Sequence, residues 1–461
     1  MPSKGVDYYS YIALPNTSIA FAGPDVGSTL TSADNFMKSH LEIDSGNLPW
    51  FTFTGTFDWD IDRNGMSIIE RQQEINSLTG NLESGDFSFM MNTPAVLGPD
   101  YTVTYGFYDA GSGIAGLTNA DQSWVTVVPK FSDWMGDVAP PNSSQEQQPF
   151  STFVLAAAHD GGMNTMSGID VVTSDPVFQT FIGALSLLIP VPGIATLLVS
   201  DAVHIMEDLA MTQKDTFTSM LDNGVRYFDF RPAYLLQAVQ DIVPPMNNTL
   251  YHTHLVIPGA RFDAFLSEVV SFLIAHPTEV VVTRISADGI QGVDIPDVAT
   301  VSQFASAAVN GTNVLVGDSS CFQMPIGALR ASGKRLIVVQ NNPKYDSYSD
   351  AAYATLDPTP IIESFANMST AGQAGNDFTV LQLQGTSTGI TDVLIYGALI
   401  ANGSTSTLMA TKAQFDMVTL PWVRENALGN LTAQQNIILM NDFIDGATTH
   451  TALEMSQARF A

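Results

Sequence analysis

The first 135 residues carry short apolar runs whose spacing is typical of β-strands. These runs are rich in aromatic and β-branched residues, and glycine, proline, asparagine and aspartate separate them. The run over residues 50–61 alternates between apolar and polar positions for much of its length, as a strand with one buried face does. The pattern predicts strands at 8–14, 50–61, 86–91, 101–108 and 124–128. Several short strands in one stretch favour an all-β sandwich.

Beyond residue 150 the pattern changes to apolar strands that alternate with helical segments. Within 262–275, for example, apolar side chains recur at helical spacing. Strands are predicted at 153–158, 225–230, 249–252, 279–285, 335–339, 379–383 and 437–442. Strands and helices in alternation favour a parallel α/β fold, most simply a β/α barrel. We therefore predict three parts: a β-sandwich accessory domain at 1–137, a polar linker at 138–150 and a β/α barrel at 151–461.

One uncharged segment, residues 176–200, fits neither pattern. It is long enough to span a bilayer, but Pro190, Pro192 and Gly193 interrupt it in the middle. We predict a pair of buried helices or a covering loop here, and no conventional transmembrane helix. The alternative is an apolar lid in which part of residues 185–199 is exposed and contacts lipid.

Composition limits the classes of partner that the chain can bind. The chain has 461 residues, of which 45% are hydrophobic and only 14% are charged. Lys and Arg together number 17 against 46 Asp and Glu, which gives a net charge of −29. So few cations cannot neutralise a run of phosphates, which argues against nucleic acid and against electrostatic attraction to anionic membranes. An anionic substrate must therefore be held by a few well-placed cations.

The cysteine content and the N-terminal sequence bear on metal sites and on the compartment. The single cysteine, Cys321, excludes an intramolecular disulfide framework and a cysteine-based zinc site. The first residues lack the basic start and apolar run of a signal peptide. We expect a cytoplasmic protein or one that is secreted by an unconventional route, and the sequence leaves the compartment open.

Residues that suit acid–base chemistry stand at the ends of four predicted strands. These residues are His159, His252, Arg231 and Asp442. Active sites of β/α barrels collect at the C-terminal ends of the strands. Two histidines can serve as general acid and general base while an arginine binds an anion. A single histidine is more often structural than catalytic, but the convergence of these residues favours a catalytic site.

Four motifs in the second part of the chain carry a family resemblance. They are Ala-His-Asp-Gly-Gly at 158–162, Thr-Gln at 212–213 followed by Asn-Gly-Val-Arg-Tyr-Phe-Asp-Phe-Arg at 223–231, Tyr-His-Thr-His at 251–254, and Asn-Asp-Phe-Ile at 441–444. With these motifs in this order, residues 150–461 resemble the phosphatidylinositol-specific phospholipase C X-domain family, in its bacterial and fungal metal-independent branch. The resemblance implies a distorted TIM-type β/α barrel.

The resemblance also implies a reaction. In the family, a general base takes the proton of the inositol 2-hydroxyl, whose oxygen attacks phosphorus. A general acid protonates the departing diacylglycerol oxygen, and a cyclic inositol phosphate results. By motif position, His159 would be the base and His252 the acid. The expected partners are a phospholipid substrate and, transiently, the membrane surface.

Three further residues take roles by motif position. Asp442 would orient and charge-stabilise His159, and Asp160 would do the same for the acid. Arg231 would hold the phosphoryl oxygens at the place where calcium-dependent relatives use a metal ligand. The resemblance therefore implies neither a metal nor another cofactor.

Two places in the chain depart from the pattern of the family. The second histidine of the family is usually followed by glycine, whereas this chain reads His252-Thr253-His254. We prefer His252 as the acid because the predicted strand ends there, and His254 is the alternative. Bacterial members of the family also bind the inositol ring with a lysine and an arginine on the middle strands, at positions that correspond to about Ser286 and Gln340 here. Both residues are neutral, which leaves the head group of the substrate open.

The predicted sandwich lies outside the resemblance. Asp60, Asp62 and Asn64 have the spacing that opens a calcium-binding loop, but the twelfth position is Arg71 and no helix is predicted before them. We favour a polar Asn-Gly turn that follows a strand. A glycan or a lipid is the ligand that we consider for this domain.

Two other functions compete with a metal-independent phospholipase C. A glycerophosphodiesterase or sphingomyelinase D type of barrel holds a metal through a Glu-x-Asp motif, but that place reads Tyr-Phe-Asp at 227–229. The other alternative is a catalytically idle barrel beneath a glycan-binding or lipid-binding sandwich. Intact His159, Arg231 and Asp442 argue against an idle barrel, whereas the neutral side chains at 286 and 340 slightly favour it.

Overall fold

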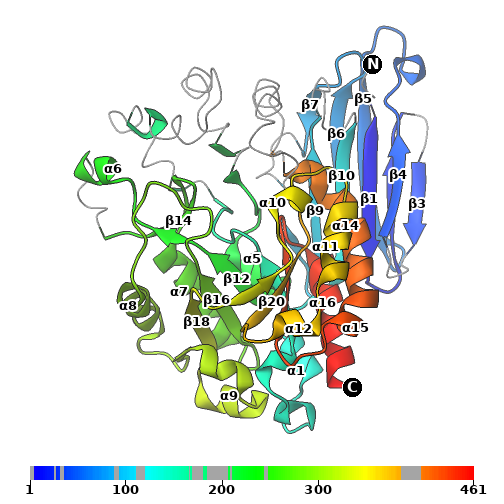
Figure 1. Cartoon of the computed structure of the whole chain (residues 1–461). Coiled ribbons are helices and arrows are strands. Elements are labelled where there is room, and N and C mark those ends of the chain that lie inside the picture. The colour runs from blue at the N-terminus through cyan, green and yellow to red at the C-terminus, as the bar shows by residue number, and fades with distance from the viewer. Residues whose placement is uncertain are drawn as a thin grey trace.

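Figure 1 shows the computed structural model of the chain, in which the N-terminal strands form one region and the remaining residues a second region beside it. The structure describes residues 5–24, 27–31, 36–87, 93–110, 120–165, 167–168, 180–183, 206–207, 210–242, 248–385, 406 and 408–461. The two regions differ in the way their sheets are built.

Two five-stranded sheets make up the N-terminal region. The first has the order β4 (Phe36–Leu41), β1 (Val6–Ile12), β10 (Asp121–Pro129), β9 (Tyr101–Tyr108) and β8 (Val96–Leu97). The second has the order β3 (Gly27–Thr31), β2 (Thr17–Ala22), β5 (Thr54–Arg63), β6 (Met66–Asn76) and β7 (Leu82–Gly85). Aromatic side chains of both sheets share one core, in which the rings of Tyr8 and Phe21 stack with their centroids 4.2 Å apart. The two sheets therefore pack face to face.

The hairpin of β5 and β6 contains the segment whose spacing resembles a calcium-binding loop. Its turn is Asn64-Gly65, and both residues have positive φ, at 54° and 80°. This is the conformation that an Asn-Gly hairpin turn requires. Asp62 Oδ1 accepts a hydrogen bond of 2.8 Å from the Gly65 backbone N–H. A strand and not a helix leads into this turn.

Two of the strands predicted in this region differ in the structure. The strand predicted at 50–61 begins only at Thr54, because residues 50–53 form an exposed loop before it. In the segment predicted as a strand at 86–91, Asp86 and Phe87 lie outside any strand, and residues 88–92 are outside the described part of the chain.

The second region is built on a sheet of eight parallel strands. Its order is β17 (Val316–Gly317), β18 (Leu336–Gln340), β16 (Val281–Ile285), β12 (Tyr227–Phe230), β11 (Val154–Ala158), β21 (Asn436–Asn441), β20 (Phe378–Gln382) and β19 (Lys344–Asp346). The central strands are buried on both faces, which explains their nearly continuous apolar runs. Over the described residues β17 and β19 do not pair with each other, so the sheet is an open, distorted form of a TIM-type barrel.

Helices surround this sheet. The longer ones are α7 (Phe262–Ala275), α8 (Val298–Val309), α11 (Thr359–Asn367), α14 (Met409–Trp422) and α16 (Gly446–Phe460). The shorter ones are α1 (Trp134–Val138), α5 (Phe217–Asp222), α6 (Gln237–Ile242), α9 (Ile326–Ser332), α10 (Asp350–Tyr353), α12 (Thr370–Gln373) and α15 (Leu428–Asn430). Single turns of other helix types are η1 (Ser45–Asn47), η3 (Gln145–Gln147), η4 (Phe150–Thr152), η6 (Ser319–Gln323) and η8 (Val423–Ala427). Helix α7 has the bounds that its apolar spacing predicts.

The described part of the chain holds no helix that is both long and apolar enough to cross a bilayer. Of the uncharged segment at 176–200, only residues 180–183 belong to that part, and they are helical. The rest of the segment, including the predicted lid at 185–199, lies outside the described residues.

The strand predicted at 249–252 does not belong to the eight-stranded sheet. It is β14 (Tyr251–His254), the middle strand of a small antiparallel sheet with β13 (Pro232–Ala233) and β15 (Ile257–Arg261). The prediction of a barrel strand at this position was wrong, because β13 and β15 satisfy the backbone hydrogen bonds of β14 on both sides. The strand also continues two residues beyond the predicted end, as far as His254.

The two regions share a core and are aligned with each other. Tyr11 of β1 and Val128 of β10 belong to the same apolar cluster as the barrel strands. Near the start of β10, Trp124 packs with Met211 and Phe443, which lie at the carboxyl ends of the barrel strands. Just beyond the end of β10, the carbonyl of Ser132 accepts a hydrogen bond from Arg226, which precedes β12. The start of β10 therefore lies on the same side of the molecule as the carboxyl ends of the barrel strands.

Candidate active site

His159 and Asp442 meet because their strands are neighbours in the barrel sheet. β11 and β21 pair in parallel, with Ala158 opposite Asn441, so the next residue of each strand stands at the same edge. The His159 backbone N–H donates to the Asn441 carbonyl at 3.1 Å. The side chains are 2.7 Å apart, with Nδ1 of His159 donating to Oδ1 of Asp442. This bond places the proton of His159 on Nδ1, so Nε2 is the nitrogen that can take a proton from a substrate.

The turn after His159 directs the carboxylate of Asp160 into the site. Asp160 has a left-handed backbone with φ of 43°, and the Gly161 N–H donates to the Asp229 carbonyl at 2.8 Å. A Cβ atom at Gly162 would lie 2.3 Å from the Cβ of His252. Only glycine fits at this position, which explains the second glycine of the motif.

Arg231 lies between the carboxylates and the first histidine. Its Nε and Nη2 atoms donate to Oδ2 of Asp229 at 3.0 and 2.6 Å. Its Nη1 atom forms an ion pair of 2.7 Å with Oδ1 of Asp160. Its Nη2 atom also lies 3.2 Å from Nε2 of His159, where the guanidinium donates and the imidazole accepts. This geometry requires the neutral tautomer of His159 that carries its proton on Nδ1.

The two candidate acids differ in exposure and in hydrogen bonding. His254 has an exposed fraction of 29% for its side chain, and its Nδ1 donates to Oδ2 of Asp160 at 3.0 Å. His252 is fully buried against Phe230, and its Nδ1 accepts from the Arg231 backbone N–H at 3.2 Å. The Nε2 atom of His252 is 3.4 Å from Oδ1 of Asp160 but forms no hydrogen bond with the described residues.

The charges of the site shift several pKa values. Burial lowers the pKa of His159, but the carboxylates of Asp160 and Asp442 raise it by more, so it lies above its ordinary value. Burial raises the pKa of Asp160, but Arg231 and His159 hold it well below its usual range. Burial lowers the pKa of His252, which favours its neutral form. The pKa of Asp229 is lowered to about 2, because Arg231 outweighs the effect of burial.

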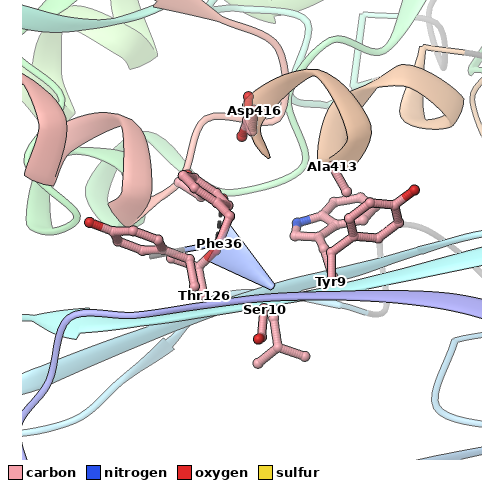
Figure 2. A pocket seen from close by; sticks show the side chains of 10 residues that line it. Tyr9, Ser10, Phe36, Thr126, Ala413 and Asp416 are labelled. Carbon is pink, nitrogen blue, oxygen red and sulfur yellow. Dashed lines mark hydrogen bonds between the residues drawn. The ribbon is translucent and has the colours of Figure 1, made fainter. Parts of the chain in front are cut away.

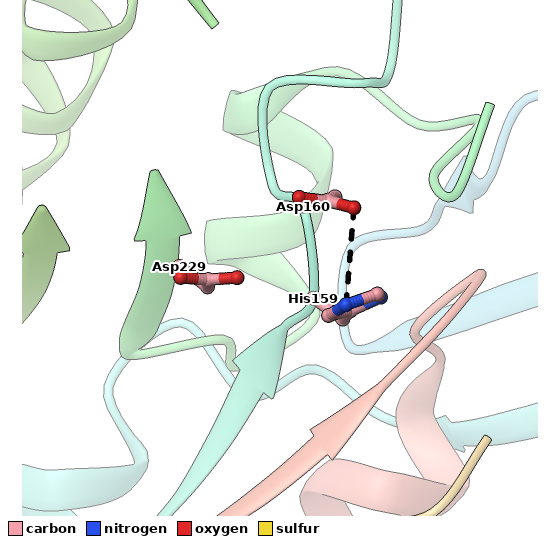
Figure 3. A group of neighbouring side chains, drawn as sticks. All are labelled: His159, Asp160 and Asp229. Atoms are coloured by element: carbon pink, nitrogen blue, oxygen red, sulfur yellow. Dashed lines mark ion pairs between the residues drawn. The ribbon is translucent and has the colours of Figure 1, made fainter. Parts of the chain in front are cut away.

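Figure 3 shows the part of the site that could hold a metal ion. Ligand atoms of His159, Asp160 and Asp229 all lie within 4.8 Å of one another. In this structure the guanidinium of Arg231 binds both carboxylates, as the bonds above show. A fixed cation is therefore already paired with the acids, and a metal ion could use them only if Arg231 moved away.

Thr212 and Gln213 connect the strand ends that carry the histidine and the aspartate. The hydroxyl of Thr212 donates to the carbonyls of His159 and Asp160 at 3.2 and 3.1 Å. The amide of Gln213 donates to the carbonyls of His159 and Asn441 at 2.9 and 3.0 Å. The sequence pointed to these two residues only as part of a motif, and the structure gives them a positioning role.

The two positions that the resemblance assigns to the inositol ring lie in different surroundings. Ser286 is buried at the end of β16, with Oγ 3.4 Å from Oδ1 of Asp229, so it is next to the site. Gln340 donates to the Pro296 carbonyl at 3.1 Å and lines a groove beside α8. No described contact connects Gln340 to the histidines or to Arg231.

Sequence reasoning missed a row of charged residues beside Ser286. Arg284 lies 3.8 Å from Asp229 and 3.3 Å from Asp288. Lys344 bridges Asp288 at 3.2 Å and Asp346 at 2.7 Å. An arginine within an otherwise apolar strand was the available signal, because a buried charge needs a partner. Arg284 and Lys344 each find these partners in acidic side chains.

A second buried charge cluster supports Asp442 from behind. The Asn441 side-chain amide donates to Oδ1 of Asp416 at 2.8 Å, and Asp416 also pairs with Lys412. Asp445, 3.5 Å from Lys412, accepts a hydrogen bond of 2.9 Å from Thr126 of β10. Burial raises the pKa of Asp416 to about 6. Figure 2 shows Asp416 and Thr126 at a pocket of about 10 Å³, room for roughly one water molecule, between the N-terminal sheet and α14.

Comparisons with known proteins give no match to a family model or to a curated protein. Among solved structures, the chain is similar to a variant of the phosphatidylinositol-specific phospholipase C from Staphylococcus aureus, with a TM-score of 0.41 and 12% identity over 70% of this chain and 96% of that one. It is also similar to the phosphatidylinositol-specific phospholipase C from Listeria monocytogenes, with a TM-score of 0.37 and 13% identity over 71% of this chain and 98% of that one. The likeness is loose at these scores, and an assignment of function has to rest on the site itself.

Proposed function

We propose that this protein is a phosphodiesterase of the phospholipase C type, which cleaves phosphatidylinositol or a related lipid without a metal ion. The observation that carries the proposal is the pair of His–Asp units on either side of Arg231. One unit is His159 with Asp442, and the other is His254 with Asp160. A base, an acid and a fixed cation are the groups that intramolecular phosphoryl transfer requires.

The first step uses His159 as the general base. Its Nε2 atom takes the proton from a substrate hydroxyl that lies next to the phosphodiester, and the hydroxyl oxygen attacks phosphorus. The bond of 2.7 Å to Asp442 fixes the required tautomer and stabilises the imidazolium that forms. The guanidinium of Arg231 lies 3.2 Å from the same nitrogen, so it can bind the phosphoryl oxygens where negative charge develops.

The second half of the reaction needs a general acid, and we propose His254 for it. Its Nδ1 is bound to Asp160, so its Nε2 can carry a proton toward the leaving oxygen, and its side chain is partly exposed. The predicted end of the strand at residue 252 favours His252, but β14 continues to His254. His252 is fully buried with a lowered pKa and accepts a hydrogen bond from the Arg231 backbone, which suits a structural role.

The products follow from these proton transfers. The attacking oxygen forms a new bond to phosphorus, and the bond from phosphorus to the leaving alkoxide breaks. The leaving oxygen takes the proton of His254, which gives a neutral alcohol, and the phosphoryl group remains as a cyclic diester. For phosphatidylinositol these products are diacylglycerol and a cyclic inositol phosphate. Arg284, which lies 3.8 Å from Asp229, and Lys344, which pairs with Asp288, are cations that could contact a polar head group.

A metal-dependent phosphodiesterase is the second candidate, because His159, Asp160 and Asp229 could serve as ligands. Incubation with phosphatidylinositol in excess chelator separates the two candidates. We expect release of a water-soluble cyclic inositol phosphate at an unchanged rate, and a release about 10⁴-fold slower from an Asp442→Asn variant. Complete loss of activity in chelator that calcium or magnesium restores would contradict the proposal and favour the metal-dependent reaction. No product from any phospholipid would favour the idle barrel.

A further inference from the structure

Two loops at one end of the N-terminal sheets expose large apolar side chains. In the loop before β5, Trp50 and Phe51 have exposed fractions of 90% and 88%, and Phe53 is half exposed. In the loop after β6, Leu78 has an exposed fraction of 56%. Isolated apolar side chains are common on protein surfaces, but four large ones on two adjoining loops are not. We call residues 48–53 and 77–80 the aromatic tip.

The aromatic tip is held in a defined shape by its own backbone. Both the backbone N–H and the hydroxyl of Ser77 donate to the Phe53 carbonyl, at 2.7 and 2.9 Å. The Thr52 N–H donates to the Pro49 carbonyl at 2.9 Å, and Phe51 has a positive φ of 68°. A bulky aromatic residue rarely adopts that conformation, so the backbone at Phe51 is strained. Strain of this kind is found at functional sites more often than elsewhere.

The direction of the aromatic tip follows from the pairing of the strands. β4 ends beside the start of β1, because Leu41 pairs with Val6, and Val6 pairs with Asp121 at the start of β10. The loop before β5 continues from this end of β4. The start of β10 lies on the side of the carboxyl ends of the barrel strands, as Trp124 packs with Phe443 next to Asp442.

The aromatic tip and the candidate active site therefore face the same side of the molecule. In Figure 1 this end of β1 lies toward the top of the view. Helix α16, which follows β21 and runs back along it, ends at the C-terminus at the bottom. A flat surface that touches the aromatic tip would thus lie over the edge of the sheet that carries His159 and Arg231.

The chemistry of the aromatic tip points to one kind of surface. Neither of its two loops contains a lysine or an arginine, and the whole chain has a net charge of −29. Attraction to an anionic surface is therefore weak, whereas tryptophan and phenylalanine favour the interfacial region of a bilayer. We propose that the aromatic tip inserts into a zwitterionic phospholipid surface and holds the candidate active site against it. The choice of lipid over a protein partner rests on the proposed function.

Vesicles of phosphatidylcholine without substrate lipid test this inference directly. Trp50 is the reporter, because Trp59, Trp124 and Trp134 are buried and Trp422 is half-buried. We expect the tryptophan emission to shift to the blue on addition of vesicles, and to be quenched by phosphatidylcholine with brominated acyl chains. A Trp50→Phe variant should lose both signals while it still binds. Raising the ionic strength from about 0.1 to 1 M should leave the binding unchanged, because charge plays little part.

A double variant, Trp50→Ser with Phe51→Ser, should bind these vesicles at least about tenfold more weakly, since most of the inserted apolar area is lost. Its folding should be unchanged, because both side chains are exposed. The matched control is Met66→Ser at the opposite end of the β5–β6 hairpin, which is also exposed, at 67%, and should bind as the parent chain does. Hydrolysis of a soluble phosphodiester should be the same in all three proteins.

Three results would overturn the inference. These are unchanged vesicle binding by the double variant, absence of quenching by brominated lipid in a chain that binds, and loss of self-association instead of vesicle binding in the double variant. The last result would assign the aromatic tip to a contact between copies of this chain. Failure of the proposed function can be told apart from failure of this inference, because vesicle binding through Trp50 would then persist without any hydrolysis. If the protein hydrolysed a soluble substrate but its vesicle binding did not depend on Trp50, only the inference about the aromatic tip would be contradicted.

Discussion

The strand β12 has a buried arginine near each end, and the two arginines are bound in different ways. Arg226, before the strand, donates five hydrogen bonds: one to Glu279 and four to backbone carbonyls. Arg231, after the strand, faces two carboxylates and the acceptor nitrogen of His159. A guanidinium has five N–H donors, so Arg226 has none left for a ligand.

The difference separates a structural end of the barrel from a chemical one. Glu279 also accepts hydrogen bonds from the backbone of Met135 and Gly136, so the Arg226 cluster fastens the chain that arrives from β10. At the other end the charged groups of Arg231 and Asp160 adjoin His159 and His254, which are both partly exposed. A buried charge whose hydrogen bonds are all made within the protein contributes to the stability of the fold. A buried charge next to groups that can gain or lose a proton can take part in a reaction.

The largest expected effect is the loss of Asp442 at the chemical end. Asp442→Asn should lower the rate of phosphodiester cleavage about 10⁴-fold, because the amide favours the wrong tautomer of His159. The substitution keeps the size of the side chain, so the midpoint of thermal unfolding should change little. Steady-state kinetics on a soluble substrate and a melting curve measure the two quantities. A variant that remains fully active would show that His159 is not the base.

Substitution of the two histidines of β14 should give the next largest effect on the rate. It also tests which of the two belongs to the chemical end of the barrel. His254→Ala should lower the rate about 10²- to 10⁴-fold, as expected for the loss of a general acid. Substrates with a more acidic leaving group, such as a nitrophenol, should recover much of this loss because they need no proton. His252→Ala, the matched control, should mainly lower the stability, since that ring is fully buried. Recovery in His252→Ala but not in His254→Ala would return the role of the acid to His252.

Replacing each arginine by methionine tests the comparison itself. Arg231→Met should lower the rate about 10²- to 10³-fold, the scale of one lost transition-state donor. Arg226→Met should cost about 3–5 kcal/mol of unfolding free energy, because Glu279 is left buried without its partner. The Arg226→Met molecules that remain folded should keep the parent rate. Urea unfolding and rates normalised to the folded fraction check both, and an equal loss of rate in the two variants would break the comparison.

The smallest expected effect is on the pH dependence. The pKa of His159 lies above its ordinary value in the folded chain, so the rate should rise with pH through a pKa above about 6.5. The sign for stability is opposite: the contribution of protonated His159 is present below about pH 6.5 and is lost as the pH rises through the folded pKa. Asp442→Asn should move the acidic limb to lower pH, since Asp442 helps to raise this pKa. Arg226→Met should leave the limb in place, and a shift there would mean that the two ends are coupled.

Local patterns in the sequence determined much of the second region. The apolar spacing of 262–275 predicted α7 to the residue, because an amphipathic helix that packs on a sheet shows its period directly. Most of the strands were also predicted, since parallel strands buried on both faces read as apolar runs. The rule that barrel sites collect at the carboxyl ends then selected His159, Arg231 and Asp442, which the structure brings together.

Only the tertiary structure decided which side chains meet across the site. The spacing of residues in a strand shows which face a side chain lies on but not which side chains surround it. Gln340 was therefore predicted to contact the substrate, whereas its amide donates to the Pro296 carbonyl beside α8. The hairpin of β14 places His254 at the strand end, and a count along the chain could not fix that end. Arg284 of β16 and Lys344 of β19 both pair with Asp288, although they are 60 residues apart in sequence and their strands are not neighbours in the sheet. Contacts of this kind arise between residues that are remote in sequence, so they cannot be predicted from a local sequence pattern.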